Sequence, residues 1–303
     1  MRPGSAPARN SLHAAGDHPL GHDLLRRLYS SMLLCRMVDE CMILRRNFHR
    51  YRPAIGCEAC RVAAAIDLES EDAVVLPARN AMIAIARGAP LTSIFPELLR
   101  MPKDTPIRNG KGAHPMITSS ALLEGDLGMS MGIAVGHKLS GRPNVLLLIS
   151  DAKSSRRAAW RNALNFAGLH KLPVLFVLET AMGPRRNFPS SAAFDSPAPP
   201  GGLPLIPVLG SDAVAIYRVA REAIHHARKG YGPTLIACQG WPAPPATERA
   251  ASLGTLPAGA PPRDPLQHME TYLKKHAAWD DDWQRGLIAS YSRQIEQAFS
   301  SFR

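Results

Sequence analysis

Two cysteines spaced as Cys57-Glu-Ala-Cys60 are the first residues in this sequence whose types and spacing could do chemistry. They stand where a helix is expected to begin, and a helix N-terminus stabilises a thiolate. A zinc site needs about four ligands, and the sequence has no second C-x-x-C motif to complete one. Cys35 and Cys41, on the neighbouring expected helix, are the other candidates. Because free cysteine is among the most buried residue types, small buried thiols are the favoured interpretation.

A group of basic residues follows two apolar runs, residues 145–149 and 174–178. Its members are Lys153, Arg156, Arg157, Arg161, Arg185 and Arg186. In one interpretation a lysine of this group pairs with an anionic ligand as a point charge. In the other, Lys153 bridges Asp151 and the arginines form a solvated helix face. The second interpretation is favoured, because runs of surface charge are usually only solvated.

Pairs of histidines and tryptophans complete the set of candidates. His225 and His226 are adjacent on an expected helix, so they do not share a face, and an exposed position is favoured over a ligand pair. Trp279 and Trp283 are four residues apart on an expected C-terminal helix. That spacing indicates packing against the protein's own core or a partner subunit, and not a platform for nucleobases.

The composition excludes several classes of protein. The 303 residues are 46% hydrophobic and 20% charged, as in a globular protein, and 36 Lys+Arg against 25 Asp+Glu give a net charge of +11. The basic residues are dispersed, without a Lys/Arg tract or RNA-binding signature, which argues against specific nucleic-acid binding. The longest apolar runs are far shorter than the roughly 18 residues of a membrane span. No secretory signal is visible, and five cysteines favour reduced thiols and a cytoplasmic location.

The candidates are positioned by an expected alternation of strands and helices. Strands are predicted at residues 72–76, 145–149, 174–178 and 233–237. Helices are predicted at residues 23–50, 128–141, 156–169 and 212–229. A further helix is expected to begin near residue 56, and two more are expected after residue 264. Two all-apolar strands joined by a helix are typical of a parallel sheet with helices on both faces, so the fold class is α/β. Residues 1–19 are expected to be a disordered tail, residues 20–303 a single domain, and residues 100–120, 189–204 and 241–265 loops.

The order of these landmarks carries a family resemblance over about residues 20–300. The residues that carry it are Tyr29, Met32, Arg36, Asp39, Glu40, Gly56, Glu58, Ala59, Asp72, Arg79, Asn165-Phe166-Ala167, Lys171-Leu172-Pro173, Gly230, Gly232-Pro233-Thr234-Leu235-Ile236 and Asp264-Pro265. Together they resemble the alpha subunit of the thiamine-diphosphate-dependent 2-oxo acid dehydrogenases, of the pyruvate, branched-chain or acetoin type. The fold implied is the thiamine-diphosphate-binding type.

The resemblance also implies an activity, cofactors and partners. The activity is oxidative decarboxylation, acting on an aldehyde or oxo group with a disulfide acceptor, and the cofactors are thiamine diphosphate and Mg²⁺. The implied cofactor-binding positions are Arg79, Leu123, Asp151, Ala152 and Lys153, and Asp151 is the implied metal ligand. No catalytic residue falls on this chain, because in the family the glutamate that activates the cofactor comes from the beta subunit. The implied partner is a beta-type dehydrogenase subunit, or else a second copy of the chain.

The residues at the implied cofactor site depart from the family pattern. The family's Gly-Asp-Gly reads Ser150-Asp151-Ala152, and where its Asn-Asn is expected the chain reads Glu179-Thr180-Ala181. The late loop, which normally supplies a histidine, has none over residues 240–249. Two hypotheses follow. In the first, the chain is an alpha subunit of a working dehydrogenase, and in one variant of this hypothesis a lysine takes the place of the metal. In the second, the chain is a non-catalytic relative that keeps the fold and the partner surface.

Overall fold

A seven-stranded sheet forms the centre of the molecule. The computed structural model describes residues 20–45, 53–76, 81–100, 107–108, 115–118, 124–151, 158–180, 202–239 and 264–301. The strands are β1 (Ala73–Leu76), β2 (Ile107–Arg108), β3 (Pro115–Thr118), β4 (Leu146–Asp151), β5 (Val174–Thr180), β6 (Leu205–Leu209) and β7 (Thr234–Gln239). They lie in the order β2-β3-β1-β4-β5-β7-β6.

Every neighbouring pair of strands is parallel except β2–β3, which is antiparallel. β4 pairs with β5 along its whole length, and helix α7 (Ala158–Leu169) connects the two. The predicted adjacent parallel strands with a helical connection are therefore confirmed. Both strands are apolar on both faces because helices cover both sides of the sheet.

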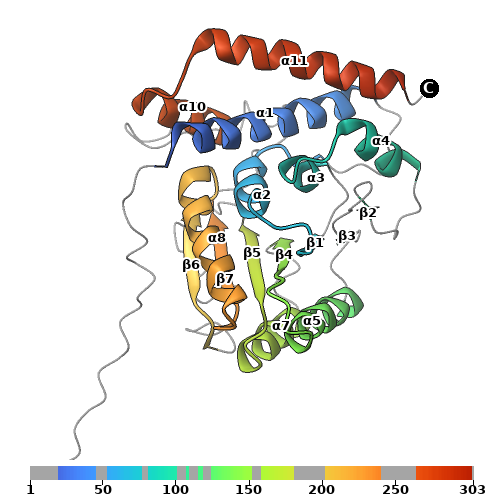
Figure 1. Cartoon of the computed structure of the whole chain (residues 1–303), viewed down its shortest axis with the longest axis vertical. Coiled ribbons are helices and arrows are strands. Elements are labelled where there is room, and N and C mark those ends of the chain that lie inside the picture. Colours follow the sequence, from blue (N-terminus) through green and yellow to red (C-terminus); the bar gives the residue numbers. More distant parts are fainter. Residues whose placement is uncertain are drawn as a thin grey trace, which may run out of the picture.

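Helices pack on the two faces of the sheet as separate layers (Figure 1). The helices are α1 (His22–Leu44), α2 (Glu58–Ala65), α3 (Met82–Ala86), α4 (Leu91–Arg100), α5 (Glu124–Leu139), α7, α8 (Ala213–Arg228), α10 (Pro265–Lys275) and α11 (Asp281–Ser300). Alternate residues of β4 and β5 contact the two layers: Leu147 and Val177 face the core with α2 and α8, and Leu148 and Phe176 face the core with α5 and α7. The α/β fold with helices on both faces is confirmed.

The tryptophans of the C-terminal segment pack against the protein's own core. Figure 1 shows α1 flanked by α10 and α11 at one end of the molecule. The Tyr29 ring of α1 lies 5.0 Å from that of Trp279 and 5.6 Å from that of Trp283, centroid to centroid. Of the two interpretations of this pair, the structure supports packing within the chain.

Three short strands were not expected from the sequence. Residues 100–120 were predicted to be a loop, yet β2 and β3 lie there, and β6 follows the predicted loop at residues 189–204. β2 and β3 are too short to show a pattern, and β6 contains Pro207, which argues against a strand except at the edge of a sheet, where β6 lies. The predicted tail, residues 1–19, lies outside the described residues. Among the described helices, none has the length and apolar character needed to cross a membrane.

A glycine fixes how closely β6 approaches β7. The Gly210 backbone N–H donates to the Gln239 carbonyl, and a Cβ added at Gly210 would lie 2.7 Å from that oxygen. We therefore expect Gly210→Ala to lower the free energy of unfolding by about 1–3 kcal/mol, because the backbone has to move. Urea denaturation measures this, with Gly136→Ala as the control, since a Cβ there meets open space. Equal effects of the two substitutions would contradict the explanation.

Candidate active site

The carboxyl ends of β4 and β5 bring the two parts of the implied cofactor motif together. The last pair in their register is Asp151 with Glu179. Ligands of open parallel sheets bind outside the carboxyl ends of the strands, so this edge is the candidate site. Of the other implied cofactor positions, Arg79, Leu123, Ala152 and Lys153 lie outside the described residues.

A buried ion pair occupies this edge. Glu179 accepts two hydrogen bonds from Arg61 of α2, from Nε to Oε1 at 2.8 Å and from Nη2 to Oε2 at 3.0 Å. Arg61 is 3% exposed and Glu179 is 2% exposed. This planar two-point contact is the strongest geometry available to a guanidinium and a carboxylate. Both oxygens of Glu179 are therefore engaged by a cation of the chain itself.

The Arg61 side chain stays charged in this setting. Burial lowers the pKa of Arg61, but the charge and hydrogen bonds of Glu179 together with the nearby Cys57 and Asp39 raise it by more, so its pKa lies above the ordinary value for arginine. The third guanidinium nitrogen, Nη1, is buried and has no hydrogen-bond partner among the residues that the structure describes. A buried donor left without an acceptor costs about 1–3 kcal/mol, so Nη1 calls for an explanation.

The C-x-x-C motif lies beside this ion pair. Cys57 and Cys60 are both 0% exposed, and the described cysteines are all free thiols. Burial raises the pKa of Cys57, and the neighbouring thiol of Cys238 together with burial raises that of Cys60. These groups are protonated, inert thiols that fill space around Arg61, in agreement with the buried-thiol interpretation.

A second buried network positions the start of α2. The Arg36 guanidinium of α1 donates to Glu58 and, at 3.0 Å, to Asp264. The other oxygen of Glu58 accepts the Gly56 backbone N–H at 2.8 Å, where Gly56 has a φ of 96° that only glycine adopts readily. All four residues belong to the family resemblance, and the structure shows what they do. They join α1, α2 and α10, and so hold Arg61 in place.

The described residues at this edge do not fit a divalent metal. Mg²⁺ takes oxygen ligands, usually one or two carboxylates with water and phosphate oxygens. The Glu179 carboxylate is already paired with Arg61, and no group of three or more His, Cys, Asp or Glu side chains within the described ranges could hold a metal. Asp151 stands at the end of β4 as the resemblance implies, but its neighbour across the strands is neutralised by an arginine.

Arg61 is the functional candidate that the sequence analysis missed. A signal was present, because residues 57–66 read CEACRVAAAI, and an arginine in the middle of such a small apolar run has to be buried with a partner. The partner, Glu179, is 118 residues away and was noted only as a departure from asparagine. Spacing along the sequence does not reveal that two positions so far apart are in contact.

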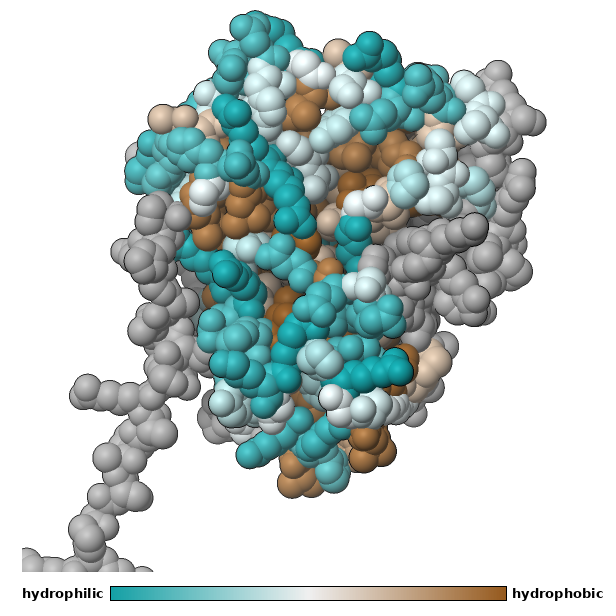
Figure 2. Space-filling view, viewed as in Figure 1, coloured by the Kyte–Doolittle hydropathy of each residue, from teal (hydrophilic) through white to brown (hydrophobic). Residues whose placement is uncertain are grey.

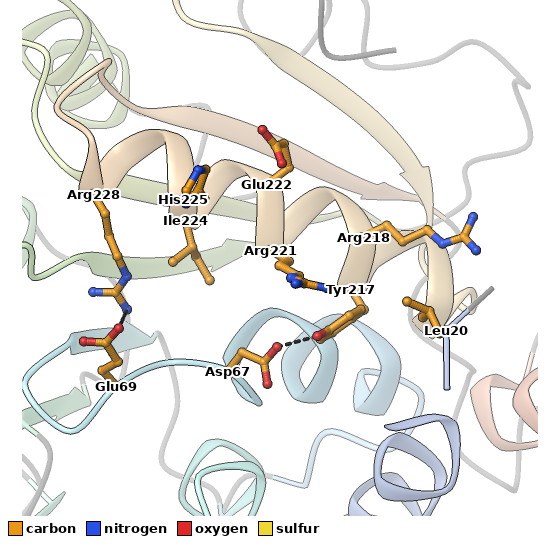
Figure 3. A pocket seen from close by; sticks show the side chains of 10 residues that line it. All are labelled: Leu20, Asp67, Glu69, Tyr217, Arg218, Arg221, Glu222, Ile224, His225 and Arg228. Atoms are coloured by element: carbon orange, nitrogen blue, oxygen red, sulfur yellow. Dashed lines mark hydrogen bonds and ion pairs between the residues drawn. The ribbon is translucent and has the colours of Figure 1, made fainter. Parts of the chain in front are cut away.

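A cavity also lies elsewhere in the described part of the chain. It measures about 590 Å³, lies between α8 and the turn before β1, and is lined by Leu20, Asp67, Glu69, Tyr217, Arg218, Arg221, Glu222, Ile224, His225 and Arg228 (Figure 3). Asp67 accepts from the Tyr217 hydroxyl, and Arg228 contacts Glu69 at 3.4 Å. Burial and the Asp67 hydrogen bond raise the pKa of Tyr217 to about 12, so this hydroxyl remains a donor. His225 is exposed here, as expected, whereas His226 is half-buried, contrary to the prediction of an exposed position for both. Asp67 and Glu69 are thus paired, and the cavity lies by the amino end of β1.

The outer face of α5 and α7 is the second candidate surface. Between them runs a groove of about 410 Å³, lined by Leu127, Gly128, Met131, Ala159, Asn162, Ala163 and Phe166. Around it, Met129, Leu139, Phe166 and Leu169 are exposed by 41–82%, and Figure 2 shows hydrophobic surface at this end of the molecule. A Cβ added at Gly128, Gly132 or Gly136 meets nothing within 4 Å. This face is therefore apolar and open to close approach by another helix.

Comparison with known proteins agrees with the fold. The family model of the dehydrogenase E1 component matches residues 29–302. The pyruvate dehydrogenase E1 component subunit alpha of Staphylococcus epidermidis is 26% identical over 291 residues, which cover 92% of this chain and 78% of the relative. The 2-oxoisovalerate dehydrogenase subunit alpha of Bacillus subtilis is 25% identical over 295 residues, 89% of this chain and 88% of the relative. The resemblance inferred from the sequence is confirmed, and the chain belongs to the dehydrogenase E1 component family.

Proposed function

We propose that this chain is the alpha-type subunit of a 2-oxo acid dehydrogenase that works together with a beta-type subunit. The observation that carries the proposal is the family match over residues 29–302. The two relatives above are named as alpha subunits of such dehydrogenases. The reaction is oxidative decarboxylation of a 2-oxo acid, in which bound thiamine diphosphate supplies the electron sink.

The contribution of this chain is to bind and orient, because it holds half of the site. The carboxyl ends of β4 and β5 take the diphosphate end of the cofactor, in the position where open parallel sheets bind ligands. The catalytic glutamate is contributed by the beta-type subunit. Free, buried thiols are consistent with a reducing compartment, and we place the protein in the cytoplasm.

The face formed by α5 and α7 is the proposed contact with the partner. Its glycines leave room for a helix to approach closely, and the exposed Phe166 and Leu169 beside them supply apolar area to bury. An exposed apolar patch of this kind is typical of an interaction site. The chain supplies this surface whether or not the assembled site performs catalysis.

A non-catalytic subunit is the second candidate function. The observation that favours it is the pairing of Glu179 with Arg61, which removes a carboxylate from the edge where a metal is expected. Such a subunit would keep the partner surface and the fold. Turnover of pyruvate or of a branched-chain 2-oxo acid by the assembled complex separates the two candidates.

Assembly is the direct test of the proposed function. We expect this chain, co-expressed with a beta-type subunit from the same genome, to purify as a complex containing both chains. Light scattering after size exclusion gives the mass, and denaturing electrophoresis gives the stoichiometry. A second copy of the chain as the only partner would revise the proposal to a homo-oligomer. A chain that stays monomeric at micromolar concentration with the beta-type subunit present would contradict it.

A further inference from the structure

We propose that the ligand site at the carboxyl ends of β4 and β5 is metal-free, and that Arg61 is its resident cation. In this site Nη1 of Arg61 binds a phosphate oxygen of the ligand directly. The inference rests on the proposed function for the nature of the ligand, a diphosphate ester. It goes beyond that function because it assigns to an arginine of α2 the phosphate contact that a divalent cation would otherwise make.

The position of Arg61 is fixed by the strand ends. Glu179 is the residue of β5 that lies opposite Asp151, the last residue of β4. Arg61 reaches Glu179 from α2, with Nε and Nη2 at 2.8 and 3.0 Å from its two oxygens. Arg61 is therefore held at this edge of the sheet by a planar contact that fixes the orientation of its guanidinium.

That contact uses only one edge of the guanidinium. Nε and Nη2 face Glu179, which leaves Nη1 on the other side, buried and without a hydrogen-bond partner within the described part of the chain. Arginine carries five N–H donors in a rigid fork that matches phosphate and carboxylate oxygens. A buried donor without an acceptor in a folded protein requires an explanation, and a ligand oxygen supplies one.

The same arrangement works against a divalent cation. The Arg61–Glu179 pair carries no net charge, so β5 offers a divalent cation no free negative charge at this position. The Glu179 carboxylate, which would otherwise attract a metal, is already neutralised by Arg61. Its two oxygens are hydrogen-bonded to a cation that belongs to the fold and does not dissociate.

Calorimetric titration of the full chain, alone and in complex with the beta-type subunit, tests the proposal. The probes are thiamine diphosphate and inorganic pyrophosphate, each in Mg²⁺ and in EDTA. We expect affinities that differ by less than about twofold between Mg²⁺ and EDTA. We also expect Arg61→Lys to weaken binding about tenfold or more, because lysine still pairs with Glu179 but has no Nη1. Arg87→Lys, a change at a partly buried arginine that contacts Asp72, is the matched control and leaves binding unchanged.

The outcomes are separable from those of the assembly test. Binding that is lost in EDTA, or that is equally tight in Arg61→Lys, overturns the proposal. So does the absence of binding by both probes in a complex that assembles; in that case assembly with the beta-type subunit stands, and the non-catalytic subunit replaces the working dehydrogenase as the proposed function. If Arg61→Lys fails to fold, the double variant Arg61→Met/Glu179→Leu removes the whole pair, and retention of wild-type affinity in it overturns the proposal.

Discussion

Arg61→Met is expected to lower the free energy of unfolding by about 3–5 kcal/mol, the largest effect among the substitutions considered for this chain. The physical reason is that Glu179 would remain 2% exposed with no cation beside it. Removal of one partner from a buried ion pair leaves an uncompensated charge in a medium that solvates it poorly. Urea denaturation followed by circular dichroism measures the change.

The double variant Arg61→Met/Glu179→Leu is the informative control for this prediction. Well-packed apolar residues often replace a buried ion pair at little cost, so we expect the double variant to recover most of the lost stability. Arg285→Met, which removes a contact with Asp282 between two exposed side chains, is the matched surface control and changes stability by about 0.5 kcal/mol or less. A double variant no more stable than Arg61→Met would show that Arg61 acts through packing and not through charge.

Gly132→Leu on α5 is expected to abolish assembly with the beta-type subunit while the chain itself stays folded. Within the chain a Cβ at Gly132 meets nothing within 4 Å, so the new side chain points into open space. Leucine is also the better helix former by roughly 0.5–1 kcal/mol, so thermal stability of the separate chain should be equal or higher. Across the interface the same side chain prevents close approach of another helix. Analytical size exclusion and thermal denaturation measure the two effects.

Gly286→Leu provides the matched comparison for the assembly experiment. Gly286 also lies within a helix, α11, and a Cβ there also meets nothing within 4 Å. The surface of α11 around it is mainly polar, so we expect this variant to assemble normally. If both variants assemble, the glycine face of α5 is not the partner surface. If neither assembles, the effect does not depend on the face carrying the leucine.

The fold was predictable from the sequence because its signals are local. Apolar runs at residues 145–149 and 174–178 and the helix between them gave the central strands, and the structure extends them to Asp151 and Thr180. The strand-end position of Asp151 was predictable for the same reason. The pairing of Arg61 with Glu179 was not, since it joins a helix to a strand through tertiary packing. β6 was missed because Pro207 is compatible with a strand only at an edge, and edges are a property of the assembled sheet.

The two edges of the sheet have a consequence for solubility. One edge is β2, only two residues long and ending in Arg108, and the other is β6, with Pro207 at its centre. An exposed edge strand offers unpaired backbone groups to any other strand, which is how native proteins aggregate or form fibrils. A very short, charged edge and a proline-containing edge both resist such addition. Neither edge of the described sheet therefore favours the addition of a strand from another chain.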